Sequence, residues 1–176
     1  MTIGRPQPGD YAPFYQKYLD ASASESDALA LLPRQDAIVT AMRSWPEAKV
    51  SHSYGEGKWT VGQVVGHMAD VERVFAYRLL RIARGDTTPL PGFDENTWQT
   101  RAGFEHRSLA SLIDELASVR QSTLTLVRSL DAAAIEREGT ASEKRVTAKA
   151  LVWLIAGHFA HHYAILRERY GLAAGG

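Results

Sequence analysis

The chain of 176 residues contains no cysteine. The protein itself therefore forms no disulfide, has no zinc site with thiolate ligands and has no cysteine nucleophile. A bound metal would need nitrogen or oxygen ligands, and thiol chemistry would need a thiol from a second molecule. Net charge is also lacking, because 20 basic and 20 acidic side chains cancel. We expect no nucleic-acid partner, since domains that bind nucleic acid usually carry a basic excess.

Long apolar runs are missing as well. No stretch approaches the 18 apolar residues that suggest a membrane-spanning helix, and the first residues, MTIGRPQPGDY, lack the apolar core of a signal peptide. We expect a cytoplasmic protein with no membrane partner. The length suits one domain, residues 1–176, with a sizeable core.

Apolar residues recur at helical spacing, and no segment shows the alternation of a strand. An aromatic stripe between Tyr11 and Tyr18 predicts a short helix that packs on the main body. Thr60 followed by Gln63 is typical of a capping box. Pro33 is expected to kink the first long helix or to move its start. The long helices are predicted at 27–45, 60–85, 108–130 and 147–170.

The connection between the second and third long helices, residues 85–107, is long. Antiparallel neighbours in bundles are usually joined by short loops, so this length favours a crossover between parallel helices. The sequence therefore predicts an all-α four-helix bundle with up-down-down-up order. Phe93, Asp94 and Trp98 in the connection are candidate pocket-wall residues.

The segment GHFAHHY, residues 157–163, holds three of the six histidines. On a helix, His158 and His162 lie one turn apart on the same face, an arrangement that gives two ligands to one metal. Residue 159 is Phe, so the glutamate of the zinc peptidase motif is missing. The apolar residues that share this face turn both imidazoles towards the interior, whereas His161 is expected at its edge.

A third ligand is expected from another helix. His67 lies between Val64 and Val71 on an inward face, and antiparallel packing of the second and fourth helices brings it level with His162. Three imidazoles that leave an open coordination position are typical of a catalytic site for a divalent transition metal, here Zn²⁺, Ni²⁺ or Fe²⁺. The alternative for each histidine is a hydrogen-bonded core residue.

Three stretches carry a family resemblance: KWTVGQVVGHMADVER, RIARGD with the later LPGFD, and GH, HH and ILRERY in the last helix. With these, the sequence resembles the DinB-like (DinB/YfiT) superfamily, DinB-2 type. The resemblance implies a four-helix bundle that is usually a homodimer, with a divalent metal on His67, His158 and His162. Relatives often have Glu-Leu where this chain has Phe159-Ala160. Characterised relatives include enzymes that use low-molecular-weight thiols, and others are described as metal-dependent hydrolases.

Three functions remain open. The first is a metal-dependent S-transferase with a low-molecular-weight thiol as cosubstrate, in which a lowered thiol pKa supplies the nucleophile. In this case Arg73, with Arg78 and Arg81 on the same helix, is a candidate anchor for cosubstrate carboxylates. Trp98 is a second candidate substrate-binding residue.

The second is a metal-dependent hydrolase, for which a general base is useful. His161, Asp70 and Glu72 are the candidates, and Asp70 is alternatively a hydrogen-bond acceptor that orients an imidazole. The third is a non-catalytic, stress-related metal-binding protein.

Overall fold

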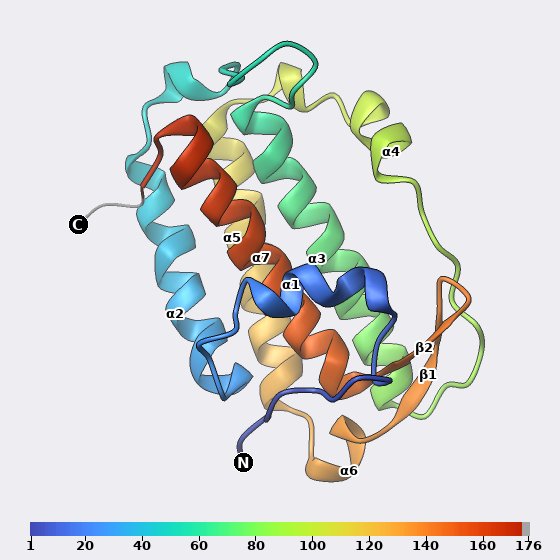
Figure 1. The fold of residues 1–176 in the computed structure, drawn as a ribbon. Coiled ribbons are helices and arrows are strands. Elements are labelled where there is room, and N and C mark those ends of the chain that lie inside the picture. The colour runs from blue at the N-terminus through green and yellow to red at the C-terminus, as the bar shows by residue number, and fades with distance from the viewer. Residues whose placement is uncertain (174–176) are drawn as a thin grey trace.

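Four long helices, α2, α3, α5 and α7, form the body of the protein (Figure 1). The computed structural model describes residues 1–173. The α-helices are α1 (Gln16–Asp20), α2 (Ala28–Ala41), α3 (Val61–Ala83), α4 (Glu95–Arg101), α5 (Leu109–Arg128), α6 (Ala132–Ile135) and α7 (Ala148–Tyr170). Short 3₁₀ helices span Pro13–Tyr15, Met42–Ser44, Glu47–Lys49 and Phe104–His106, and the strands are β1 (Glu138–Ala141) and β2 (Lys144–Thr147).

The order of the bundle follows from the helix directions. Helices α2 and α7 run one way, and α3 and α5 run the other way (Figure 1). Helix α3 packs against α5 and α7, and α2 packs against the same two helices. The predicted up-down-down-up bundle is therefore confirmed, and the long connection joins the parallel neighbours α3 and α5.

The ends of the long helices are fixed by local hydrogen bonds that the sequence predicts. The Thr60 side chain accepts from the Gln63 N–H while the Gln63 side chain accepts from the Thr60 N–H, which is the predicted capping box. Each such cap is worth about 1 kcal/mol. Side chains also cap α2, α5 and α7, through Asp27, Ser108 and Thr147.

Pro33 lies inside α2 and does not move its start. The helix begins at Ala28, because the Asp27 carboxylate accepts hydrogen bonds from the N–H groups of Leu29 and Ile3. That cap fixes the first turn ahead of the proline. Of the two expected effects of Pro33, the moved start is therefore wrong, and the kink stays a prediction.

The expectation that the chain has no strand is also wrong. Strands β1 and β2 pair antiparallel, with Ala141 opposite Lys144, and the turn residues Ser142 and Glu143 both have positive φ. Such a turn usually contains Asn-Gly or Asp-Gly, so Ser-Glu gives no sequence signal. The backbone of Leu90 bonds to the hairpin at both Thr140 and Ser142, which ties the crossover connection to it.

Two apolar clusters fill the bundle. On α7, residues up to Ala156 belong to one cluster and residues from Phe159 belong to the other. On α3, the change occurs between Ala69 and Val71. The histidines of α3 and α7 therefore lie near the boundary between the two clusters.

Helix α1 crosses α7 (Figure 1), and its backbone packs closely against α7 at Gly157. It is the predicted aromatic helix, formed here as a 3₁₀ turn followed by one α-helical turn. A Cβ atom at Gly157 would lie 2.1 Å from the Tyr18 carbonyl oxygen and 2.6 Å from its carbonyl carbon. Only glycine allows this approach, which brings Tyr18 next to His158 on α7.

We expect Gly157→Ala to lower the free energy of unfolding by about 2 kcal/mol or more, because the new methyl group must displace the α1 backbone. At an unconstrained helical position the same substitution would add up to about 1 kcal/mol of stability. Denaturant unfolding measures the change. Gly4→Ala is the control, since nothing lies within 4 Å of a Cβ there. An increase in stability for Gly157→Ala would contradict the close approach.

Candidate metal centre

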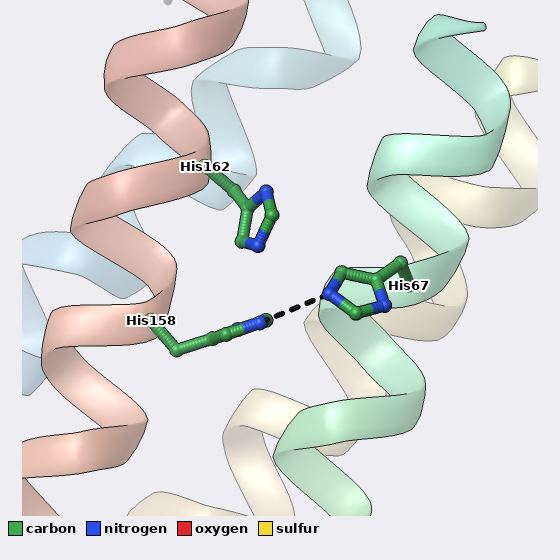
Figure 2. Close-up of side chains that lie close together, drawn as sticks. All are labelled: His67, His158 and His162. Atoms are coloured by element: carbon green, nitrogen blue, oxygen red, sulfur yellow. Dashed lines mark hydrogen bonds between the residues drawn. The ribbon is translucent and has the colours of Figure 1, made fainter. Parts of the chain in front are cut away.

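Three histidine side chains meet in the space between α3 and α7. His67 comes from α3, and His158 and His162 come from successive turns of α7 (Figure 2). One ring nitrogen of each lies within 4.8 Å of those of the other two. The Nε2 atoms of His67 and His158 are 3.1 Å apart. The structure thus brings together the three residues that the sequence proposed as metal ligands.

Aromatic side chains pack around the three imidazoles. The Trp59 ring lies 4.9 Å from the His67 ring, centroid to centroid, and the Tyr18 ring lies 5.1 Å from the His158 ring. Phe75 on α3 packs edge-on against His158, and the centroids of the two rings are 6.0 Å apart. This packing limits the rotation of the imidazoles and covers part of their surface.

Burial keeps all three imidazoles uncharged. It lowers the pKa of His67 from 6.5 to about 4, with smaller contributions from the positive charge of Lys17 and from the neighbouring His161. Burial also lowers the pKa of His158 and of His162 well below 6.5, and the neighbouring histidines add to the shift. Neutral imidazole is the form that binds metals.

The donor set fits a divalent transition metal. It consists of three neutral nitrogen donors, which suit Zn²⁺, Ni²⁺ or Fe²⁺ and do not suit Mg²⁺ or Ca²⁺. Three protein ligands leave a coordination position for another molecule. The chemistry and the placement of the side chains therefore agree with the metal site that the sequence predicts.

Two cavities large enough for a small molecule reach the histidine cluster from different sides, and a third of only about 10 Å³ reaches His67. His158 lines a cavity of about 490 Å³ between α1, α3, α7 and the start of α4. His162 lines a second cavity of about 190 Å³, together with Trp59 and Tyr170. Small molecules can therefore approach the cluster by two routes.

His161 and Asp70 lie beside the cluster without joining it. His161 is half-buried, as expected for the edge of the helix face, and its ring centroid is 5.0 Å from that of His162. Asp70 shares a small cavity with His67 but pairs with Arg73 at 3.5 Å, and burial raises the pKa of its carboxyl group. Among residues 1–173, Asp70 makes no hydrogen bond to an imidazole.

Glu72 lies in the core and lines none of these cavities. Its carboxylate accepts a hydrogen bond from the Arg120 guanidinium at 2.7 Å. Burial raises the pKa of Glu72, and the charge of Arg120 opposes that rise. A general base needs access to the substrate. The predicted role of Glu72 as a general base therefore does not fit its buried position.

The candidate substrate-binding residues, Arg73 and Trp98, share an apolar cavity of about 310 Å³ outside α3. Arg73 pairs with Glu115 at 2.6 Å, and Trp98 stacks on Phe93 with ring centroids 4.6 Å apart. Phe93 also lines the cavity that contains His158, as does Asp94. The pocket-wall residues of the connection are therefore placed at cavities, while anchoring of substrate by Arg73 or Trp98 stays a prediction.

Arg78 and Arg81 are engaged elsewhere. The buried Arg78 guanidinium donates to the Pro91 carbonyl at 2.7 Å and to the Ser142 hydroxyl at 3.0 Å, which joins the connection to the hairpin. Arg81 pairs with Asp86. A role for these two as anchors of cosubstrate carboxylates does not fit these contacts.

The sequence did not identify Tyr18 and Lys17 as cavity residues, although the aromatic stripe that includes Tyr18 was recognised. Both line the larger cavity next to His158. Their place on the cavity wall cannot be predicted from helical spacing, because it depends on the tertiary contact between α1 and Gly157.

Comparison with known proteins agrees with this site and fold. Residues 31–166 match the DinB superfamily. The chain belongs to this superfamily. Among solved structures, it resembles YfiT from Bacillus subtilis, described as a probable metal-dependent hydrolase with an unusual four-helix bundle topology. The identity is 20%, the TM-score is 0.68, and the match covers 96% of this chain and 94% of YfiT. No curated protein matches the sequence.

The family resemblance inferred from the sequence motifs is therefore confirmed, and so is the bundle that it implied. Among the described helices, none is long and apolar enough to cross a membrane.

In the metal-free protein, we expect the free energy of unfolding to fall as the pH is lowered from 6.5 towards 4. The unfolded histidines bind protons in this range, whereas folded His67 stays neutral until its pKa of about 4 is reached. His67 alone accounts for roughly 3 kcal/mol, since a tenfold difference in proton affinity is worth about 1.4 kcal/mol.

Denaturant unfolding with a chelator present, in wild type and His67→Gln, measures this contribution. The stability difference between the two proteins should shift in favour of the variant as the pH falls. His106→Gln is the control, since the His106 side chain is 82% exposed. A difference for His67→Gln that is the same at all pH values would contradict burial of a neutral imidazole.

Proposed function

We propose that this protein is a metal-dependent enzyme that acts on a small molecule in the cavity beside His158. The observation that carries the proposal is the cluster itself: three buried, neutral imidazoles with ligand atoms within 4.8 Å of one another, with His158 and His162 each on the wall of a cavity. Closed structural sites do not need such a cavity. The combination of an incomplete ligand set and adjacent space is typical of catalysis.

The residues around the histidine cluster have separate roles in this proposal. His67, His158 and His162 would hold the metal, which when bound acts as a Lewis acid and favours the deprotonated form of a thiol or a water molecule. Trp59 and Phe75 would hold the imidazole rings in place by packing against them. The aromatic walls of the larger cavity would bind the apolar part of a substrate.

The first reaction class is S-transfer from a low-molecular-weight thiol. Two cavities of different size reach the cluster, next to His158 and next to His162, and this arrangement suits two substrates. Neither carboxylate considered as a general base is well placed, since Glu72 pairs with Arg120 in the core and Asp70 pairs with Arg73. The thiol route has less need of a general base than hydrolysis, because the pKa of a thiol is much closer to neutrality than that of water.

The second class is metal-dependent hydrolysis. It is supported by the description of YfiT, which shares the fold across nearly the whole chain. One substrate and a water molecule would then use the same site, with the smaller cavity as a route for water.

Purified protein loaded with Zn²⁺ can be assayed in two panels. One combines cysteine or glutathione with chlorodinitrobenzene or with a nitrophenyl ester, and the other contains nitrophenyl esters and amides without thiol. We expect turnover that requires the thiol. The His158→Ala variant should lose both the metal and this turnover, whereas His106→Ala should keep both.

Hydrolysis that needs no thiol would favour the second class. Absence of turnover in both panels, with one metal still bound per chain, would contradict an enzymatic role and support the non-catalytic alternative.

A further inference from the structure

Tyr18 is a buried phenol on the wall of the larger cavity. Its side chain comes from α1, and the residue is 7% exposed. The ring stands edge-on to His158, with ring centroids 5.1 Å apart and planes at 69°. Tyr18 and His158 line the same cavity of about 490 Å³. A molecule in this cavity therefore contacts the phenol and the cluster together.

The Tyr18 hydroxyl has no hydrogen-bond partner among residues 1–173, unlike the other two buried tyrosines. The Tyr11 hydroxyl donates to the Gln16 side chain at 2.7 Å, and the Tyr170 hydroxyl donates to the Trp59 carbonyl at 2.6 Å. The Tyr18 hydroxyl keeps some accessible surface on the cavity wall, since it is not among the enclosed polar atoms that lack a partner. It is therefore available to donate to a molecule bound in the cavity.

The phenol is a donor at neutral pH. The ordinary pKa of tyrosine is about 10, so the hydroxyl is protonated at neutral pH. The hydroxyl therefore keeps its proton and can share it with an oxygen atom that carries negative charge. Charge-assisted hydrogen bonds of this kind are stronger than those between neutral groups.

The other side chains that line the cavity indicate what kind of molecule it can bind. Val71, Phe75 and Phe93 supply apolar surface, and Lys17, Asp94 and Glu95 supply the charged groups. The Asp94 carboxylate is already occupied as the cap of α4, where it accepts from the Asn96 N–H. The cavity thus suits a molecule with an apolar or aromatic part and a polar group that can reach Tyr18 and His158.

We propose that the Tyr18 hydroxyl donates a hydrogen bond to the carbonyl oxygen of the substrate and stabilises the negative charge that this oxygen acquires. As the nucleophile adds, its electron pair forms the new bond to carbon, and the carbonyl π pair moves onto oxygen. When that pair returns to re-form the carbonyl, the bond from carbon to the leaving group breaks, and the leaving group departs with the electron pair and takes up a proton from water. Tyr18 retains its proton throughout. The nucleophile is the thiolate or hydroxide of the proposed function, on which this inference rests. The substrate class is then a carbonyl compound such as an ester, amide or thioester.

Benzohydroxamate is a suitable probe, because it combines a phenyl ring with a charged oxygen and binds divalent metals. The Kd for benzohydroxamate is measured by calorimetry on Zn²⁺-loaded wild type, Tyr18→Phe and Tyr11→Phe. Absorption spectra of the Co²⁺-loaded forms report binding at the metal. We expect a Kd about tenfold or more higher for Tyr18→Phe and unchanged for Tyr11→Phe. Metal content and thermal stability of all three proteins show whether the fold and site are intact.

Equal Kd values for wild type and Tyr18→Phe, with the Co²⁺ spectrum changing in both, would overturn the role of Tyr18 and leave the proposed function standing. No binding to metal-loaded wild type would contradict an open metal site, and so would overturn the proposed function and this inference together. A Tyr18→Phe protein that has lost its metal would show that Tyr18 supports the cluster, which also overturns the role proposed here.

Discussion

Burial of three uncharged imidazoles between α3 and α7 is the constraint on which the rest of the structure depends. Histidines at these positions remove apolar packing from the centre of the bundle, and they tolerate burial only as neutral rings. Aromatic residues from several segments compensate by surrounding them. Trp59 covers the cluster beside His67, and Tyr18 covers it beside His158. The cavity left at this edge is where the proposed chemistry takes place.

A buried polar network connects α7, which carries His158 and His162, to the other three long helices. Arg120 of α5 donates to Glu72 of α3 and to Gln35 of α2, and Gln35 donates to the Ala156 carbonyl of α7, two residues before His158. The Arg120 guanidinium also lies 4.9 Å from the centre of the Phe159 ring. Buried ion pairs add little net stability but can specify one arrangement of a core. Here one network contacts all four long helices next to the histidine pair.

The segments outside the bundle close the larger cavity. Helix α1 approaches α7 closely at Gly157, and the crossover connection supplies Phe93 and the start of α4. The hairpin holds that connection through Leu90 and Arg78. Sequence segments that are far apart therefore meet at one wall, and the shape of the cavity depends on all of them.

Much of the bundle and the histidine cluster could be predicted from the sequence, because local rules determine them. The Thr60 cap and the i, i+4 spacing of His158 and His162 each follow from neighbours within one or two turns. The hairpin, the Arg120 partner of Glu72 and the position of Tyr18 depend on tertiary contacts, which periodicity does not encode. The homodimer and the thiol cosubstrate stay predictions.

Anomalous diffraction from crystals of the Zn²⁺-loaded protein tests the central claim most directly. The account predicts one zinc peak per chain, at about 2.0–2.1 Å from a ring nitrogen of each of His67, His158 and His162. A zinc peak that lacks one of these three ligands, or that lies at the exposed His106, would contradict it.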